Sequence, residues 1–220
     1  MLAKEQELVE AKKIEDTDGL LILEKPLPLD NLDQQIICAD SLFTEWPKVD
    51  AIIGNPPYLG SRYIAKEHGY DYANKLYARF PGVPKMADFC THWFRLAHDA
   101  LPPGGRAGLV GTNTIRQNES RQASLDYVVQ NGGTITEAVS TEVWSGEAAV
   151  HVSIVNWVKG EQAGTKKLLT QLGDNEDDEW KIEELSEINP TLSTSTATST
   201  AADLQTNQKP KLVFLSLIHI

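Results

Sequence analysis

The chain has 220 residues, and its composition already excludes several classes of protein. Apolar residues make up 41%, enough for a folded core, so a wholly disordered chain is excluded. No apolar run reaches the ~18 residues of a membrane-spanning helix, and the charged N-terminus lacks the apolar stretch of a secretion signal. Cys38 and Cys90 cannot build a disulfide framework and have no metal-ligand spacing. We therefore expect a soluble, cytoplasmic protein.

The net charge of −11 is unevenly distributed along the chain. Residues 55–125 carry nine Lys and Arg against five Asp and Glu, whereas residues 1–54 and 126–220 are both acidic. Charge balance bears on partners and solubility rather than on fold. We expect the functional site in the positive central region, although scattered solvated charges would give the same counts.

The predicted elements alternate between strands and helices along the chain. A helix ends within residues 5–14, and Ile- and Val-rich runs predict buried strands at 34–39 and 49–54, joined by a short helical turn. Apolar spacing and breaking or capping residues predict the elements that follow. These are a helix over 86–101, a strand over 106–113, a helix over 120–131, and two strands over 134–144 and 149–160 that form an antiparallel hairpin.

This alternation predicts an α/β fold with an open, mostly parallel sheet and a terminal antiparallel hairpin. The predicted domain covers residues 1–160. Residues 173–187 are strongly acidic and 191–207 are rich in Ser and Thr, so we interpret 161–220 as a linker.

The most informative segment is Asn55-Pro56-Pro57-Tyr58, directly after the strand predicted at 49–54. Two prolines fix φ and remove two N–H donors, which leaves a rigid turn rich in acceptors. Gly54 permits an unusual backbone or a close ligand approach. Ligands bind open α/β sheets in the crevice at the carboxyl ends of the strands. A Pro-Pro turn that merely ends a strand, with Tyr58 as ordinary packing, is the alternative.

Two acceptors and one aromatic ring suit an exocyclic amine on a planar heterocycle. The Asn55 amide oxygen and the Pro56 carbonyl would accept both N–H bonds of that amine. This favours sp³ character at the nitrogen and frees its lone pair for attack. Tyr58 offers a flat face on which the heterocycle can stack.

The Asn55–Tyr58 motif and the segments at 37–43, 105–116 and 143–157 occur in the order found in a known family. On these features the chain resembles the class I methyltransferases that use S-adenosyl-L-methionine. Within these it is similar to the gamma-type adenine-N6 DNA enzymes, and specifically to the MmeI-like type II restriction–modification enzymes. The resemblance covers about residues 25–190. It implies part of a Rossmann-like methyltransferase sheet, double-stranded DNA as partner, and methyl transfer to N6 of a flipped-out adenine without a metal.

The resemblance also assigns the catalytic motif and one cofactor contact. Asn55, Pro56, Pro57 and Tyr58 form the motif, and Asn at its first position is typical of adenine-N6 enzymes. Asp40 resembles the acid that accepts a hydrogen bond from the amino group of the cofactor's adenine. A cap of the following turn is the alternative role for Asp40.

Four further residues are implied as substrate contacts. Trp144 stands where the family offers a second aromatic face to the base, although a core or hairpin Trp is nearly as well supported. Arg62, Arg116 and Arg121 are candidates for DNA phosphate contacts, with solvated arginines as the alternative.

The chain also departs from the family pattern. The Gly-containing cofactor loop should precede residues 37–43, but Gly19 is the only glycine before Gly54. We therefore expect the catalytic half of a methyltransferase domain, cut from a longer protein with a target-recognition domain downstream, and inactive and without tight cofactor binding when alone. The final residues 215–220 resemble a translated sequencing-transposon end.

Two other functions use the same sequence features. A protein-glutamine or RNA methyltransferase would employ the same amine chemistry, and a non-catalytic binding fragment would need no cofactor. Cytosine-C5 methylation is excluded because neither cysteine follows a proline.

Overall fold

The computed structural model describes residues 36–144, 150–173 and 178–194. The chain divides into two compact units, Met1–Asp40 and Ser41–Ile220. Of the first unit, only the exposed residues 36–40 are described. In chain order the elements are β1 (Ala51–Gly54), α2 (Ser61–His68), α3 (Tyr70–Arg79), α4 (Thr91–Ala100), β2 (Arg106–Thr112), the 3-10 helix η2 (Asn113–Arg116), α5 (Asn118–Ala123), α6 (Leu125–Gln130), β3 (Gly133–Val143), β4 (His151–Lys159), β5 (Lys166–Gln171) and β6 (Trp180–Leu185).

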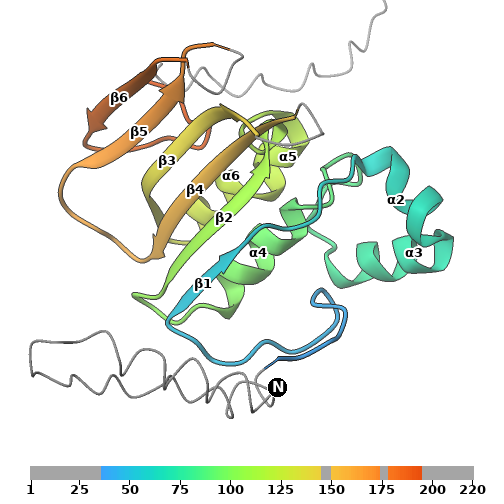
Figure 1. Ribbon diagram of the computed structural model, residues 1–220. Coiled ribbons are helices and arrows are strands. Elements are labelled where there is room, and N and C mark those ends of the chain that lie inside the picture. The colour runs from blue at the N-terminus through green and yellow to red at the C-terminus, as the bar shows by residue number, and fades with distance from the viewer. Residues whose placement is uncertain (1–35, 145–149, 174–177, 195–220) are drawn as a thin grey trace, which may run out of the picture. The chain divides into compact units, whose positions relative to one another are not determined.

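The strands form a mixed sheet in the order β1-β2-β4-β3-β5-β6 (Figure 1). The α/β class and the predicted β3–β4 hairpin are confirmed. Between the described strands, β1–β2 and β3–β5 pair in parallel, and the other three pairs are antiparallel. The parallel part is smaller than predicted because β4 lies between β2 and β3. Since β4 runs against both neighbours, β1, β2 and β3 all end at the same edge of the sheet.

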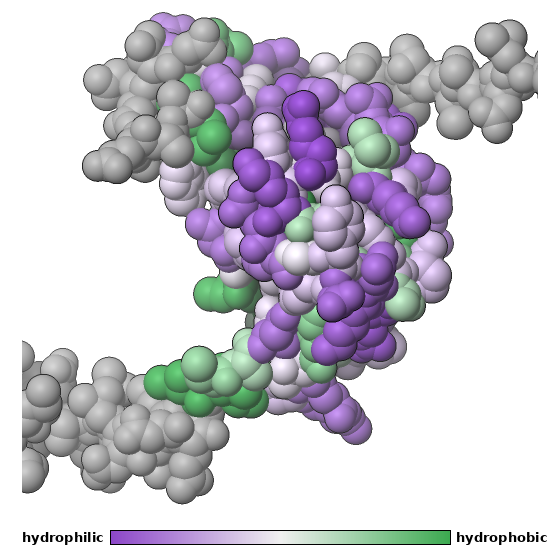
Figure 2. Space-filling view, turned by 90° about the vertical axis from the view of Figure 1, so that its right-hand side faces the viewer, coloured by the Kyte–Doolittle hydropathy of each residue, from purple (hydrophilic) through white to green (hydrophobic). Residues whose placement is uncertain are grey.

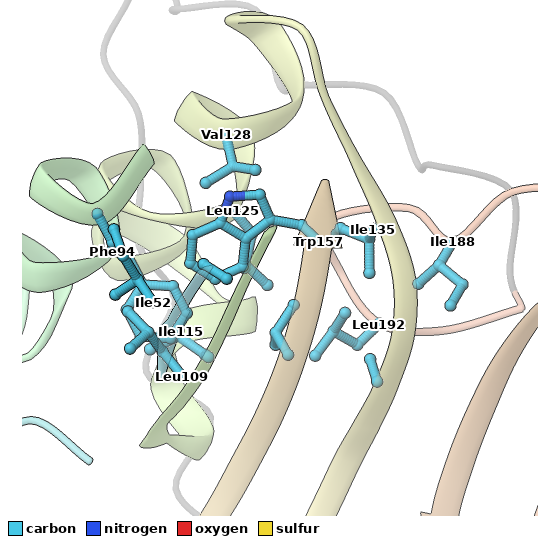
Figure 3. Packing of buried hydrophobic residues seen from close by; sticks show 14 of the residues in the cluster. Ile52, Phe94, Leu109, Ile115, Leu125, Val128, Ile135, Trp157, Ile188 and Leu192 are labelled. Carbon is cyan, nitrogen blue, oxygen red and sulfur yellow. The ribbon is translucent and has the colours of Figure 1, made fainter. Parts of the chain in front are cut away.

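Helices α4, α5 and α6 cover one face of this sheet (Figure 1). Trp157 of β4 stacks on Phe94 of α4, with ring centroids 5.7 Å apart and an interplanar angle of 18°. Leu109 and Leu125 complete the packing around these rings (Figure 3). Burial of such large apolar side chains contributes about 2 kcal/mol or more each. The core therefore fixes α4 against β2 and β4.

A second apolar cluster holds α2 and α3. Ile64 and Leu76 are fully buried there, together with Phe80 and Phe89 at 6% and 3% exposure. Trp93 of α4 packs against both clusters. The segment from the end of β1 through α3 is therefore anchored to the start of α4, beside the end of β1.

Close packing at Gly111 sets the end of β2. A Cβ on this residue would lie 2.8 Å from Ile115 and 3.1 Å from Phe94, closer than normal carbon contacts. Only glycine lets η2 fold back onto the strand at this point. The backbone that follows β2 is therefore held near the core.

Several sequence predictions need correction. Residues 36–39 form no strand, and Ile36 and Ile37 are exposed, because the run pairs with no described strand. The helix predicted over 86–101 begins only at Thr91. The helix over 120–131 is broken at Ser124, whose hydroxyl donates to the carbonyls of Ser120 and Ile115.

The region after Gly160 contributes two strands where the sequence predicted a linker. β5 pairs with β3, and β6 pairs with β5. Leu168 is 1% exposed and packs in the main core. The sheet therefore extends beyond the predicted boundary, because the alternating burial of β5 outweighs the polar composition around it. The helix end predicted within 5–14 lies outside the described residues.

No helix in the described ranges is both long and apolar enough to cross a lipid bilayer.

Candidate functional site

The turn Asn55–Tyr58 follows the last residue of β1, as the sequence predicted. Pro56 is buried, whereas Asn55 and Pro57 are exposed. Gly54 does not have a positive φ, and a Cβ there would meet only Leu109, at 3.3 Å. The prolines, rather than an unusual glycine backbone, therefore hold the turn in place.

The side chains of the turn contact one another. The Tyr58 hydroxyl donates a hydrogen bond to the Asn55 Oδ1 atom. Because Asn55 is exposed, its carboxamide does not point into the core. The second lone pair of Oδ1 remains available to another donor. No donor in the described part of the chain bonds the Pro56 carbonyl. The turn therefore offers two acceptors, the Asn55 Oδ1 atom and the Pro56 carbonyl.

Tyr58 is half-buried against the main core. Burial raises its pKa, and the nearby Cys90 thiol adds to the rise, while the hydrogen bond to Asn55 lowers it. Burial raises the pKa of Cys90 to about 11, so this cysteine is a neutral thiol near pH 7. The Tyr58 ring therefore lies at an apolar wall, which favours stacking of a planar ligand.

The loop before α4 fastens the turn from one side. The Phe89 N–H donates to the Leu59 carbonyl over 2.9 Å, directly after Tyr58. Thr91 Oγ1 donates to the Asp88 carbonyl over 2.7 Å. These bonds place the residues that begin α4 beside the candidate site.

A polar cluster at the end of β2 was missed by the sequence reasoning. The Asp88 Oδ2 atom accepts hydrogen bonds from Thr112 Oγ1 at 3.0 Å and from Thr114 Oγ1 at 2.5 Å. The Asp88 N–H donates to Ser120 Oγ over 3.0 Å. These residues are 24 to 32 positions apart, so no local pattern could reveal them. Their bonds join the loop before α4 to the backbone that follows β2.

The three predicted phosphate contacts have different surroundings. Arg62 is exposed on α2, and its guanidinium lies 5.4 Å from the centre of the Tyr63 ring. Figure 2 views the side that carries α2 and α3, and this side is mostly hydrophilic. Arg116 donates to Asn113 Oδ1 over 2.6 Å, and burial lowers its pKa. Arg121 forms an ion pair with Asp126 at 3.1 Å. Of the three, Arg62 is the most accessible to a DNA phosphate.

Trp144 follows β3 at the edge of the sheet where β1 also ends. The backbone N–H of Trp144 donates to the Val150 carbonyl over 2.9 Å, and the indole side chain is half-buried. Three strand spacings separate β1 from β3, about 14 Å at ~4.8 Å each. The structure therefore brings Trp144 to the predicted edge without placing it against Tyr58.

The residues described ahead of β1 do not form a cofactor cradle. Asp40 is exposed and belongs to the first unit. Residues 36–50 contain no glycine, so they offer no Gly-rich turn for close approach to a nucleotide. Apart from Asp40, the predicted site residues would bind the methyl acceptor rather than the methyl donor.

Comparisons with known proteins bear on the family and the fold of the chain. The family model "MmeI, DNA-methyltransferase domain" matches residues 2–170. DNA methyltransferase A of Bacillus subtilis (strain 168) is 27% identical over 134 residues, which is 57% of this chain and 15% of the relative.

A solved structure shares the fold. The Type IIL restriction-modification enzyme MmeI in complex with DNA superposes with a TM-score of 0.57 at 23% identity. The match covers 67% of this chain and 20% of the MmeI chain. This chain thus spans about a fifth or less of both relatives. Since the family model covers most of its length, the chain belongs to the MmeI DNA-methyltransferase domain family.

Proposed function

We propose that this chain is the catalytic half of a DNA methyltransferase domain, and that, as part of a longer protein, it serves to methylate the N6 amine of an adenine flipped out of duplex DNA. S-adenosyl-L-methionine is the methyl donor that the family resemblance implies, with Asp40 as a contact to its adenine. The observation that carries the proposal is the exposed Asn55 carboxamide beside Tyr58 and the Pro56 carbonyl.

Asn55 and Pro56 would hold the reacting amine. The adenine N6 atom carries two N–H donors, and consecutive residues of the turn offer two acceptors. Accepting both hydrogen bonds favours a pyramidal nitrogen whose lone pair points at the methyl group. The prolines fix this geometry before the base arrives, so little reorganisation is needed at reaction.

Tyr58 would stabilise the extruded base. Flipping a nucleotide out of a duplex costs a few kcal/mol, and stacking on an aromatic ring returns about 1–3 kcal/mol. Trp144 would add a second aromatic face when DNA is bound. Arg62 would hold a phosphate beside the site, with Arg116 and Arg121 as further phosphate contacts after Arg121 exchanges Asp126 for the DNA backbone.

The test is the chemical identity of the methylated product. The reading frame is first extended in both directions, and the longer protein that it encodes is called the parent protein. The parent protein is incubated with unmethylated duplex DNA and S-adenosyl-L-methionine carrying a deuterated methyl group. We expect deuterated N6-methyladenine in the nucleoside digest measured by mass spectrometry.

Parallel reactions with tRNA and with a glutamine-containing protein serve as substrate controls. Label found only in RNA or in protein would contradict the DNA assignment, and label on cytosine would contradict the adenine assignment. The 220-residue chain alone, titrated with the cofactor by calorimetry, should give no tight binding.

A further inference from the structure

The side chain of Asp88 joins two segments that border the candidate site. Its Oδ2 atom accepts hydrogen bonds from Thr112, the last residue of β2, and from Thr114 in η2. Its backbone N–H donates to Ser120 at the start of α5. One carboxylate thus ties the loop before α4 to the backbone after β2.

The same loop holds the Asn55–Tyr58 turn. The Phe89 N–H, one residue after Asp88, donates to the carbonyl of Leu59, one residue after Tyr58. Cys90 and Tyr58 both pack in the main core cluster, and the Cys90 Sγ atom contacts Thr112 Oγ1 at 3.7 Å. Asp88 therefore lies between the turn after β1 and the turn after β2.

We propose that Asp88 is a positioning residue. It sets the distance between the Asn55–Tyr58 turn and the Thr112–Thr114 segment, and this distance determines the width of the space that would hold the flipped base. The inference rests on the proposed function. The carboxylate acts through its hydrogen-bond acceptors, because both hydroxyls that contact it are donors. A carbonyl oxygen in the same place would do the same.

The first test uses the chain as it stands. In a Cys38→Ser background, Cys90 is the remaining thiol, and its reaction with a thiol reagent reports opening of the Asp88–Thr112 contacts. We expect Asp88→Ala to speed labelling about tenfold through local opening, and Asp88→Asn to leave it close to wild type. Asp99→Ala is the matched control, because it removes one Tyr127 hydrogen bond at the other end of α4.

The second test measures kcat and KM for DNA methylation in the parent protein. Asp88→Ala should lower kcat about 30-fold and change KM for DNA less than about threefold, because misplacement by about 1 Å can cost ~100-fold in rate. Asp88→Asn should restore kcat to within about threefold of wild type, since its amide oxygen can accept both threonine hydroxyls. Thr112→Val should show part of the Asp88→Ala loss.

Three results would overturn the inference. These are an unchanged kcat in Asp88→Ala, an Asp88→Asn variant as slow as Asp88→Ala, and Cys90 labelling equal in Asp88→Ala and Asp99→Ala. If the wild-type parent does not methylate adenine while Cys90 labelling still depends on Asp88, the proposed function fails and the structural link stands. If Asp88→Ala does not fold, Asp88→Asn and Thr112→Val carry the test.

Discussion

The hydrogen bond between Tyr58 and Asn55 orients two side chains of the motif before any ligand binds. The phenol hydroxyl donates to Oδ1 of the carboxamide, so the two side chains hold each other in one arrangement. Fixing them in the free protein reduces the side-chain entropy that a ligand must otherwise overcome. Asn55 is exposed, so its carboxamide is accessible to a ligand. The motif therefore presents an oriented acceptor before the substrate binds.

His92 is a residue whose burial has a consequence for stability. It is 1% exposed, its Nδ1 atom lies 2.9 Å from the Phe89 carbonyl, and its Nε2 atom has no partner in the described parts of the chain. Burial lowers the pKa of His92 to about 4, with the nearby Arg95 charge acting in the same direction and the Phe89 bond against it. The folded protein therefore keeps this imidazole neutral.

We predict that His92 makes the protein less stable as the pH falls. Above pH ~6.5 the imidazole is neutral in both states and has no effect. Between pH ~6.5 and 4 the unfolded chain binds a proton that the folded chain does not, so the free energy of unfolding falls by about 3 kcal/mol. In urea unfolding at pH 7 and pH 4, wild type should lose about 3 kcal/mol more than His92→Gln. Equal losses in the two proteins would contradict this.

Single elements differ in how well the sequence predicted them. The strand β1 and the β3–β4 hairpin follow from runs rich in Ile and Val, and β2 follows from a short apolar run after a Pro-Gly breaker, because burial selects apolar residues locally. The break at Ser124 does not, since its cause is a hydroxyl that bonds the distant Ile115 carbonyl. The strands β5 and β6 were missed because they are short, and polar or charged residues make up at least half of each.

The residues of the candidate site were likewise predicted from the sequence only in part. Asn55 through Tyr58 are contiguous, so the chemistry of the turn could be proposed from the sequence. The contacts of Asp88 with Thr112 and Thr114 depend on how α4 packs against β2, and no spacing rule gives that. Trp144 was predicted from the family order and Arg62 from the positive charge of the central region, and their roles stay predictions.

The carbonyls at the C-terminal end of α4 accept hydrogen bonds from a lysine of another element. The Nζ atom of Lys159, the last residue of β4, donates to the carbonyls of His98, Asp99 and Leu101 at 2.8, 3.2 and 2.8 Å. A positive charge at a helix C-terminus interacts favourably with the helix dipole and with carbonyls that lack intrahelical partners. Lys159 therefore couples the helix that borders the site to the sheet.

We predict that Lys159→Met lowers the free energy of unfolding by about 2 kcal/mol, the usual range for hydrogen bonds to a charged group. Methionine retains most of the aliphatic stem and removes the charge. The control is Lys181→Met, which breaks an exposed ion pair with Glu183 and should cost less than about 0.5 kcal/mol. Urea unfolding followed by circular dichroism measures both, and similar losses in the two variants would disprove the capping role.

At the scale of the whole molecule, the direction of the strands assembles the site. β1, β2 and β3 end at one edge of the sheet because β4 runs against its neighbours. Asn55 and Trp144 directly follow β1 and β3, and Thr112 is the last residue of β2. In open α/β sheets this edge is where ligands bind. The sheet therefore brings residues that are spread over 90 sequence positions to one edge.

The central claim is that the Asn55 carboxamide holds the amine that is methylated. It is tested most directly by the methylation rate of Asn55→Ala in the parent protein, with N6-methyladenine as the readout and Asn131→Ala as the control. Asn131 makes a side-chain bond to Tyr127 at the end of α6, far along the chain from the turn. We expect Asn55→Ala to keep the wild-type melting temperature and to lose at least about 100-fold in rate, while Asn131→Ala stays near wild type. An Asn55→Ala protein that methylates adenine at the wild-type rate would contradict it.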